Sequence, residues 1–185
     1  MKSIARCVSV ALVAGSLVAG GLIGGCTTAP KAEDRAALAA SAQGALASFK
    51  AKDPTLQPLI NKSVGWAIFP DIGKAAFWVG GSYGRGELYE RGKLIGYADL
   101  TGVSGGFTWG AQSYSELLLF LRQEELDKFK RGDWSLEGNV SAVLLTAGAA
   151  GRTDPSKGVI ALVDTKGGAM VEAAIGGQRF RFTPL

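Results

Sequence analysis

The segment GVSGG at residues 102–106 places Ser104 in the G-x-S-x-G pattern of a serine that attacks acyl groups. Such a serine needs a general base to accept its proton, and the chain contains no histidine for this role. The pattern also requires a helix directly after the serine, whereas the following FTWGAQ is typical of a strand. We therefore expect no serine hydrolase, and we expect that the protein is not an enzyme.

Metal and cofactor chemistry is not indicated either. Zinc binding through histidine and cysteine is excluded, and no segment has the spacing of a calcium-binding loop. The glycines of GGSYGRG at residues 80–86 stand in the reverse order of a dinucleotide fingerprint, and a strand follows them. A carboxylate pair for glycoside hydrolysis is an alternative for Glu87, Glu90, Asp99 and Glu137, which we interpret as solvated residues. We expect no metal and no cofactor.

Cys26 is the residue whose chemistry the sequence defines best. The chain begins with Lys2 and Arg6 and continues with an apolar stretch and then small residues, the layout of a secretory signal. A membrane-spanning helix is the rival interpretation, but residues 8–23 are short for the roughly 20 residues that span a bilayer. The residues LIGG before Cys26 resemble the lipobox of bacterial lipoproteins, in which this cysteine is acylated and becomes the new N-terminus. An ordinary cleavage site with an incidental cysteine is the alternative.

These features predict a signal peptide at residues 1–25, a lipidated tether at residues 26–30 and a single domain at residues 31–185. Thr27 stands where an aspartate would resemble an inner-membrane retention signal, so we expect a palmitate-type anchor in the outer membrane, with the domain facing the periplasm. Loss of Cys7 with the signal peptide means that Cys26 has no disulfide partner.

The charge balance bears on the partners of the protein. The chain has 20 Lys and Arg against 16 Asp and Glu, and loss of Lys2 and Arg6 leaves 18 against 16. This small excess is too weak to indicate nucleic acid binding. Any site for an anionic partner must therefore be local.

Two helices are predicted at the start of the domain. Residues 31–52 are rich in alanine, with acids near the start and lysines near the end, and a shorter helix is predicted at residues 56–62. The apolar residues on one face of the first helix are Leu38, Ala42, Ala45, Leu46 and Phe49. We expect this face to pack on the domain, with membrane contact as the alternative.

The rest of the domain is predicted to be rich in strands. Runs of aromatic and aliphatic residues separated by glycine and polar turns favour strands at residues 64–69, 75–84, 86–90, 94–102, 104–112 and 114–121. Residues 91–93 predict a hairpin turn, and a helix is predicted at residues 122–132. Further strands are predicted within residues 141–149, 158–177 and 178–184, with a turn at residues 165–168.

Glycines inside these strands favour strong curvature of the sheet. The predicted fold class is α+β, with N-terminal helices packed on a strongly curved, mostly antiparallel, Gly-rich β-sheet or barrel-like core.

Several cations stand close to aromatic residues along the first part of the domain. We expect them to contact anionic lipid headgroups, and they are Lys50, Lys52, Lys62, Lys74 and Arg85. Phe49 and Trp78 are the residues that we expect to enter the membrane interface. The alternative is that the aromatic residues belong to the core and the lysines are scattered surface charges.

Two long segments, VGWAIFPDIGKAAFWVGGSYGRGEL and IGYADLTGVSGGFTWGAQSYSELLLFL, resemble the SYLF-domain family. The resemblance rests on the order of an A-I-F-P strand, a glycine-rich segment and a G-A-Q-S segment, and extends over residues 31–182. It implies a lipid-binding module, because eukaryotic relatives bind phosphoinositides and bacterial relatives are often envelope lipoproteins. It also implies membrane contact by the N-terminal helix, whereas the actin binding of some eukaryotic relatives is not carried over.

The sequence thus predicts a non-enzymatic envelope lipoprotein, anchored through acylated Cys26, whose domain binds anionic, phosphoinositide-like phospholipid headgroups. The alternative is a structural or protein-interaction lipoprotein whose domain binds a protein or cell-wall partner. The oligomeric state is left open at this point.

Overall fold

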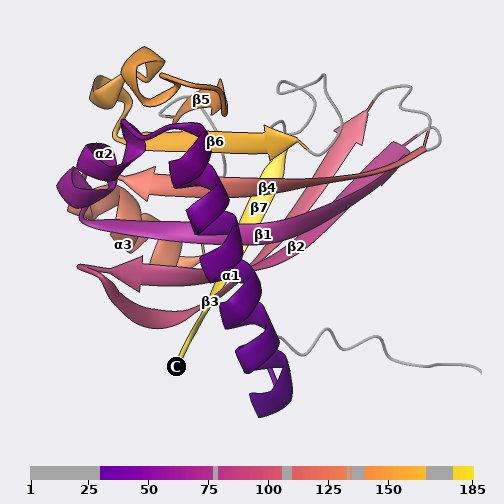
Figure 1. Cartoon of the computed structure of the whole chain (residues 1–185). Helices are drawn as coiled ribbons and strands as arrows, with labels where there is room; N and C mark the ends of the chain where they lie inside the picture. The colour runs from indigo at the N-terminus through magenta and orange to yellow at the C-terminus, as the bar shows by residue number, and fades with distance from the viewer. Residues whose placement is uncertain (1–29, 77–78, 106–109, 133, 135–139, 166–176) are drawn as a thin grey trace, which may run out of the picture.

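The computed structural model describes residues 30–76, 79–105, 110–132, 134, 140–165 and 177–185 (Figure 1). Its α-helices are α1 (Ala32–Lys52), α2 (Leu56–Lys62) and α3 (Gln123–Arg131), and its short 3-10 helices are η1 (Ala150–Arg152) and η2 (Pro155–Lys157). Its strands are β1 (Gly65–Ala76), β2 (Val79–Glu90), β3 (Lys93–Gly105), β4 (Gly110–Phe120), β5 (Val140–Leu144), β6 (Val159–Thr165) and β7 (Gln178–Pro184). Every one of these elements lies within residues 32–184.

The strands form one sheet in the order β5-β6-β4-β1-β2-β3-β7. Neighbouring strands of this sheet pair antiparallel except for β5 and β6, which are parallel. The prediction of an α+β fold with a mostly antiparallel sheet is therefore confirmed. The barrel-like alternative is not what forms, because the sheet is open and ends at β5 on one edge and at β7 on the other.

The sheet is covered on both faces, which explains the continuous apolar run in β4. Leu117 and Leu119 face a cluster that includes residues of α1 and α2, whereas Leu118 and Phe120 face a cluster that includes residues of α3. A strand buried on both faces carries apolar residues at successive positions rather than at alternate ones. We call the side of α1 the outer face and the side of α3 the inner face. Figure 1 shows α1 crossing one side of the sheet and α3 on the other.

Strong coiling brings β7 back over the inner face of the sheet. In Figure 1, β7 passes behind β4 and β1 at a steep angle, although it is paired only with β3. The Gln178 side chain on β7 reaches β4, where its Nε2 donates to the hydroxyl of Tyr114 at 3.1 Å and to Oε2 of Glu116 at 2.9 Å. The predicted strong curvature is thus present.

Glycine permits this coiling at positions where two strands approach closely. A Cβ atom on Gly86 would lie 2.4 Å from the carbonyl oxygen of Ile68 and 2.7 Å from Cδ1 of Phe69. Such distances are far shorter than normal van der Waals contacts, so only glycine fits there. The glycines of β2 therefore continue the strand and do not interrupt it.

The predicted strand boundary within β2 is absent because its glycines do not interrupt the strand. Residues 75–84 and 86–90 were expected as separate strands, but residues 79–90 form the single strand β2. Of the strand expected at residues 104–112, residues 104 and 105 belong to β3 and residues 110–112 to β4, and residues 106–109 lie outside the described residues. The predicted hairpin between β2 and β3 is confirmed, with Arg91 and Gly92 at φ 50° and 77° in the turn.

The predicted helices are also confirmed, and α1 packs on the sheet. Its acidic residues lie in the first turn and its lysines in the last, as the helix dipole favours. Ala42 and Phe49 are its fully buried side chains, and both belong to the outer-face cluster. The apolar face of this helix therefore packs on its own domain and is not free.

Candidate functional site

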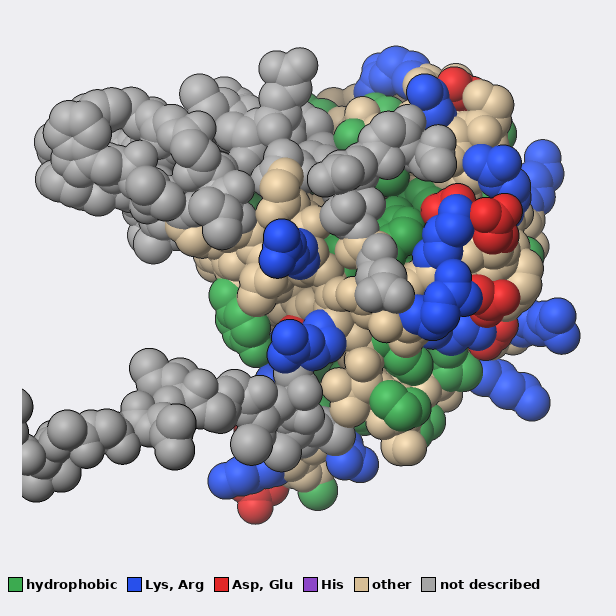
Figure 2. Space-filling view, turned by 180° about the vertical axis from the view of Figure 1, so that it is seen from behind, with side chains coloured by type: hydrophobic (Ala, Val, Ile, Leu, Met, Phe, Trp, Pro, Cys, Tyr) green, Lys and Arg blue, Asp and Glu red, His purple; other side chains and the backbone are tan. Residues whose placement is uncertain are grey.

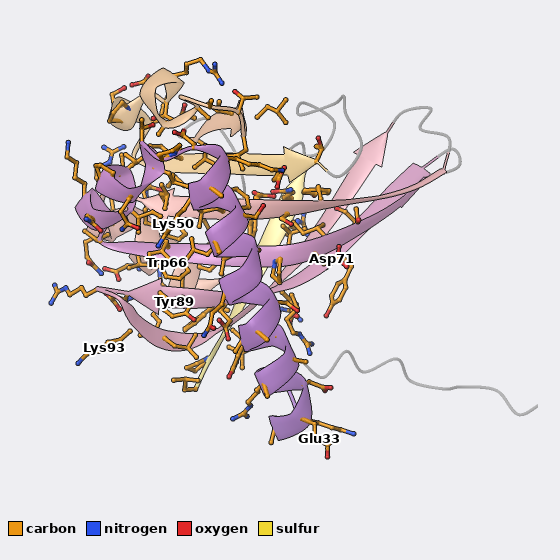
Figure 3. The ribbon with its side chains drawn as sticks, in the orientation of Figure 1. Glu33, Lys50, Trp66, Asp71, Tyr89 and Lys93 are labelled. Atoms are coloured by element: carbon orange, nitrogen blue, oxygen red, sulfur yellow. The ribbon has the colours of Figure 1, made fainter. Side chains whose placement is uncertain are left out.

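The cations predicted to bind headgroups do not form one cluster. Nζ of Lys52 lies 2.6 Å from Oδ1 of Asp164 on β6, whereas Nε of Arg85 lies 2.8 Å from Oδ1 of Asp99 on β3. Strands β4 and β1 separate β6 from β2, the strand of Arg85. In the view of Figure 3, Lys50 and Trp66 lie on one side of α1 and Asp71 lies on the other. Lys62 is exposed in the last turn of α2.

The remaining predicted residues divide into one correction and several that the structure does not describe. Phe49 is fully buried beneath α1, so the prediction that it contacts the membrane is wrong for this conformation. Its apolar ring is more stable in the core than in water, and the helix docks accordingly. Cys26, Trp78 and the side chain of Lys74 lie outside the described residues.

A different group of charged residues does converge, on the outer face of β2, β3 and β7. Arg85 pairs with Asp99, and Asp99 pairs with Arg181, so these three residues form a row across the strands. Tyr83 pairs with Thr101, which pairs with Arg179, and this forms the next row. Directly paired residues share a face of a sheet, with their Cβ atoms about 5 Å apart. We call these six residues the arginine face.

Asp99 organises the β2 side of the arginine face. Its Oδ1 accepts hydrogen bonds from Nε of Arg85 at 2.8 Å and from the hydroxyl of Tyr83 at 3.1 Å. The hydrogen bond to Asp99 raises the pKa of Arg85, and partial burial together with the charge of Asp99 raises the pKa of Tyr83. Arg85 therefore stays cationic and Tyr83 stays a neutral hydroxyl throughout the physiological pH range.

The outer side of this face is open to solvent. Arg179 and Arg181 are exposed. Tyr83 is 52% exposed, a larger exposed fraction than that of any other aromatic side chain among the described residues. The N-terminal part of α1 ends the open region at Tyr97, where the Arg35 guanidinium lies 5.6 Å from the ring centroid and the ring is buried. The arginine face therefore begins where the cover of α1 stops.

Two lysines of α3 are neutralised by acidic neighbours. Lys128 and Lys130 of α3 form salt bridges with Glu124, Asp127 and Glu90. Figure 2 shows the molecule from behind, with Lys and Arg intermixed with Asp and Glu along one edge and a few isolated basic side chains elsewhere. In contrast, Arg179 and Arg181 form no salt bridge with any residue that the structure describes.

Our sequence reasoning included Arg85 but missed Arg179 and Arg181. The signal was present in the alternation of arginine and phenylalanine at residues 179–182, which places both arginines on one face of β7. In the structure Phe180 is buried in the inner-face cluster and both arginines point the other way. What the sequence lacked was the pairing of β7 with β3.

A groove of about 360 Å³ between α1 and the sheet is a poorer candidate for an anion. Its lining includes the hydroxyl residues Ser41, Ser48 and Ser115 and the carboxylates of Asp71 and Asp164. The Asp71 carboxylate opposes the binding of a phosphate, and the Lys52 ammonium that could attract one is already paired with Asp164. The polar lining of the groove also does not suit an acyl chain.

The sequence also raised catalytic and metal-binding alternatives. Ser104 lies within β3 and pairs with Gly80, so it does not stand at a turn between a strand and a helix. Over the described residues, no three acidic, cysteine or histidine residues come together in a way that could hold a metal ion.

No helix in the described part of the chain has the length and apolarity to cross a membrane.

Comparison with known proteins adds no identity to this geometry. No known family model matches the chain, and no curated protein matches it.

Proposed function

We propose that this chain is a non-enzymatic envelope lipoprotein, anchored through acylated Cys26, whose arginine face binds the headgroups of anionic phospholipids. The observation that carries the proposal is the open face of β2, β3 and β7, where three arginines and Tyr83 surround one carboxylate. Its net charge of three cations against one anion is concentrated on a chain whose overall charge is small.

The residue types suit this task. Guanidinium groups present several N–H donors in a planar fork that matches phosphate oxygens, and they remain charged at any physiological pH. An exposed tyrosine places an apolar ring at the level of headgroups while its hydroxyl stays hydrated or bonded. A rigid sheet holds these groups at fixed spacing, so little conformational entropy is lost when a headgroup binds.

A lipid anchor makes a weak headgroup site useful. Tethering the domain to the membrane raises the effective concentration of headgroups at the site to roughly millimolar levels. The similarity to SYLF-domain proteins, which include lipid-binding members, supports the same function. The lipobox at Cys26 and the residue Thr27 after it support anchoring to the outer membrane, with the domain in the periplasm.

Vesicle co-sedimentation of residues 30–185, which contain all described elements, tests the proposal without the anchor. We expect binding to vesicles with anionic lipid at low salt, weakening at high salt, and none to vesicles of neutral lipid. Because each basic residue near a membrane contributes about 1 kcal/mol, Arg179→Gln with Arg181→Gln should weaken binding about 30-fold.

A double variant with the same loss of charge provides the control. Lys62→Gln with Lys93→Gln removes two exposed lysines outside the arginine face and should weaken binding much less. Equal weakening by both double variants would show that net charge, not this face, attracts the membrane. Absence of binding under all conditions would overturn the proposal and favour a protein or cell-wall partner.

A further inference from the structure

The arginines of the arginine face fall into two groups on either side of β3. Arg85 stands on β2 with Tyr83, and Arg179 and Arg181 stand on β7. Strands in a sheet are spaced about 4.8 Å apart, so β2 and β7 are about 10 Å apart across β3. On β7, two residues along one strand on one face lie about 7 Å apart. The spacing therefore separates a single arginine on β2 from a pair on β7.

Asp99 on β3 keeps the two groups separate. It lies in register between Arg85 and Arg181, and it is bonded to Arg85 and Tyr83. Its carboxylate repels a phosphate placed over the centre of the face, where a single anion would otherwise be shared by all three arginines. Two anions, one above each group, avoid this repulsion and use every cation.

Each group can hold a phosphate in its own way. Arg179 and Arg181 are exposed and have no salt bridge among the described residues, so both guanidinium groups can turn toward one phosphate. Arg85 uses Nε for Asp99, and its side chain remains 34% exposed, so its terminal N–H groups can reach a second phosphate. Between them, the Thr101 hydroxyl and the Asp99 carboxylate offer partners for a hydroxyl group.

We infer that the arginine face takes a headgroup in which two phosphodiesters are joined by a short hydroxylated bridge, as in diphosphatidylglycerol. This inference rests on the proposed function and names its ligand class. The two phosphates contact the β2 group and the β7 group, and the hydroxyl of the bridge lies over Asp99 and Thr101. Headgroups with one phosphate engage only one group at a time.

The test compares two vesicle compositions of equal charge. Residues 30–185 are titrated with phosphatidylcholine vesicles that contain either diphosphatidylglycerol or twice that molar amount of phosphatidylglycerol. Because occupation of one group raises the effective concentration of the second phosphate at the other, we expect about 10-fold tighter binding to the diphosphatidylglycerol vesicles.

Variants show whether the preference arises from the two groups. Arg85→Gln alone, and Arg179→Gln with Arg181→Gln, should each reduce the preference to less than about 2-fold, because either change leaves one group. Asp99→Asn should strengthen binding to phosphatidylglycerol vesicles and thereby also reduce the preference.

The outcomes separate this inference from the proposed function. Equal binding to both vesicles at matched charge overturns the two-phosphate inference and leaves anionic headgroup binding intact. A preference that survives both Arg85→Gln and the β7 double variant also overturns it. Binding to neither vesicle overturns the inference and the proposed function together.

Discussion

Nε2 of Gln178 on β7 donates a hydrogen bond to Oε2 of Glu116 on β4 at 2.9 Å, across the inner face of the sheet. Both side chains are buried, and Oε1 of Glu116 has no hydrogen-bond partner among the described residues. Burial raises the pKa of Glu116 from 4.5 to about 7, and the Gln178 hydrogen bond offsets only part of this effect. The contact joins the strand that carries Arg179 and Arg181 to the centre of the sheet.

Glu116→Gln should remove a pH dependence of stability. Because the folded protein holds this proton more tightly than the unfolded chain, the contribution of Glu116 to stability is fully present below pH 4.5 and is lost as the pH rises through about 7. The shift from 4.5 to about 7 corresponds to about 3 kcal/mol. In urea unfolding, the free energy of unfolding of the wild type should therefore be lower at pH 8 than at pH 5. That of the variant should be similar at the two pH values.

Glu33→Gln is the control for this experiment, since Glu33 is an exposed carboxylate near the start of α1. It should leave the difference between pH 5 and pH 8 unchanged. If the wild type were equally stable at both pH values, Glu116 would not be a buried titrating group.

Asp53→Ala should destabilise the junction between α1 and α2. The buried Asp53 carboxylate accepts hydrogen bonds from the backbone N–H of Ala150 at 2.8 Å and of Thr55 at 3.0 Å. Burial alone would raise the pKa of Asp53, but these donors and the Thr55 hydroxyl outweigh it, and the pKa lies below 3.8. Because a depressed pKa stabilises the fold only above it, this contribution is lost as the pH falls through that lowered value.

The expected loss of unfolding free energy in Asp53→Ala at pH 7 is about 2 kcal/mol, measured by urea denaturation. Asp154→Ala removes an exposed carboxylate that accepts hydrogen bonds from the backbone N–H and the hydroxyl of Ser156, so it should have a much smaller effect. Equal effects of the two substitutions would contradict a special role for the buried carboxylate.

Phe49→Ala should destabilise the domain without altering the membrane contact. Phe49 is fully buried in the outer-face cluster, and removal of such a ring costs about 3 to 5 kcal/mol. Thermal denaturation should show the loss, whereas Gln43→Ala at an exposed position of α1 should not. Reduced vesicle binding by folded Phe49→Ala protein, with stability unchanged, would instead support a membrane contact at this residue.

Gly86→Ala should weaken the fold where β2 approaches β1. The added Cβ would lie 2.4 Å from the carbonyl oxygen of Ile68, and such overpacking costs about 1 to 3 kcal/mol. Gly73→Ala is the matched control, because Gly73 lies on the neighbouring strand and a Cβ added there would have no atom within 4 Å. Comparison of the two melting temperatures measures the steric effect, and similar values would exclude it.

Much of the local structure could be predicted because its causes lie within a few residues. The alanine-rich segment with acids at one end predicted α1, and the Arg91–Gly92 turn predicted the hairpin of β2 and β3. The alternation along residues 178–184 predicted β7 as a half-buried strand. The predicted break between strands at Gly84 and Gly86 was wrong, because glycine resembles a break until its neighbours, Ile72 and Phe69, are seen to fill the space of a side chain.

The candidate site depended on contacts that no local pattern contains. Arg85 and Arg181 are far apart in the chain, and only the pairing of β3 with both β2 and β7 places them on either side of Asp99. Phe49 and Lys52 resembled membrane-facing residues by type, but packing of α1 buries the first and pairs the second with Asp164. Most helices and strands could be identified from local periodicity and turn chemistry. The convergence of charges depends instead on strand order and register, which arise from long-range burial and pairing.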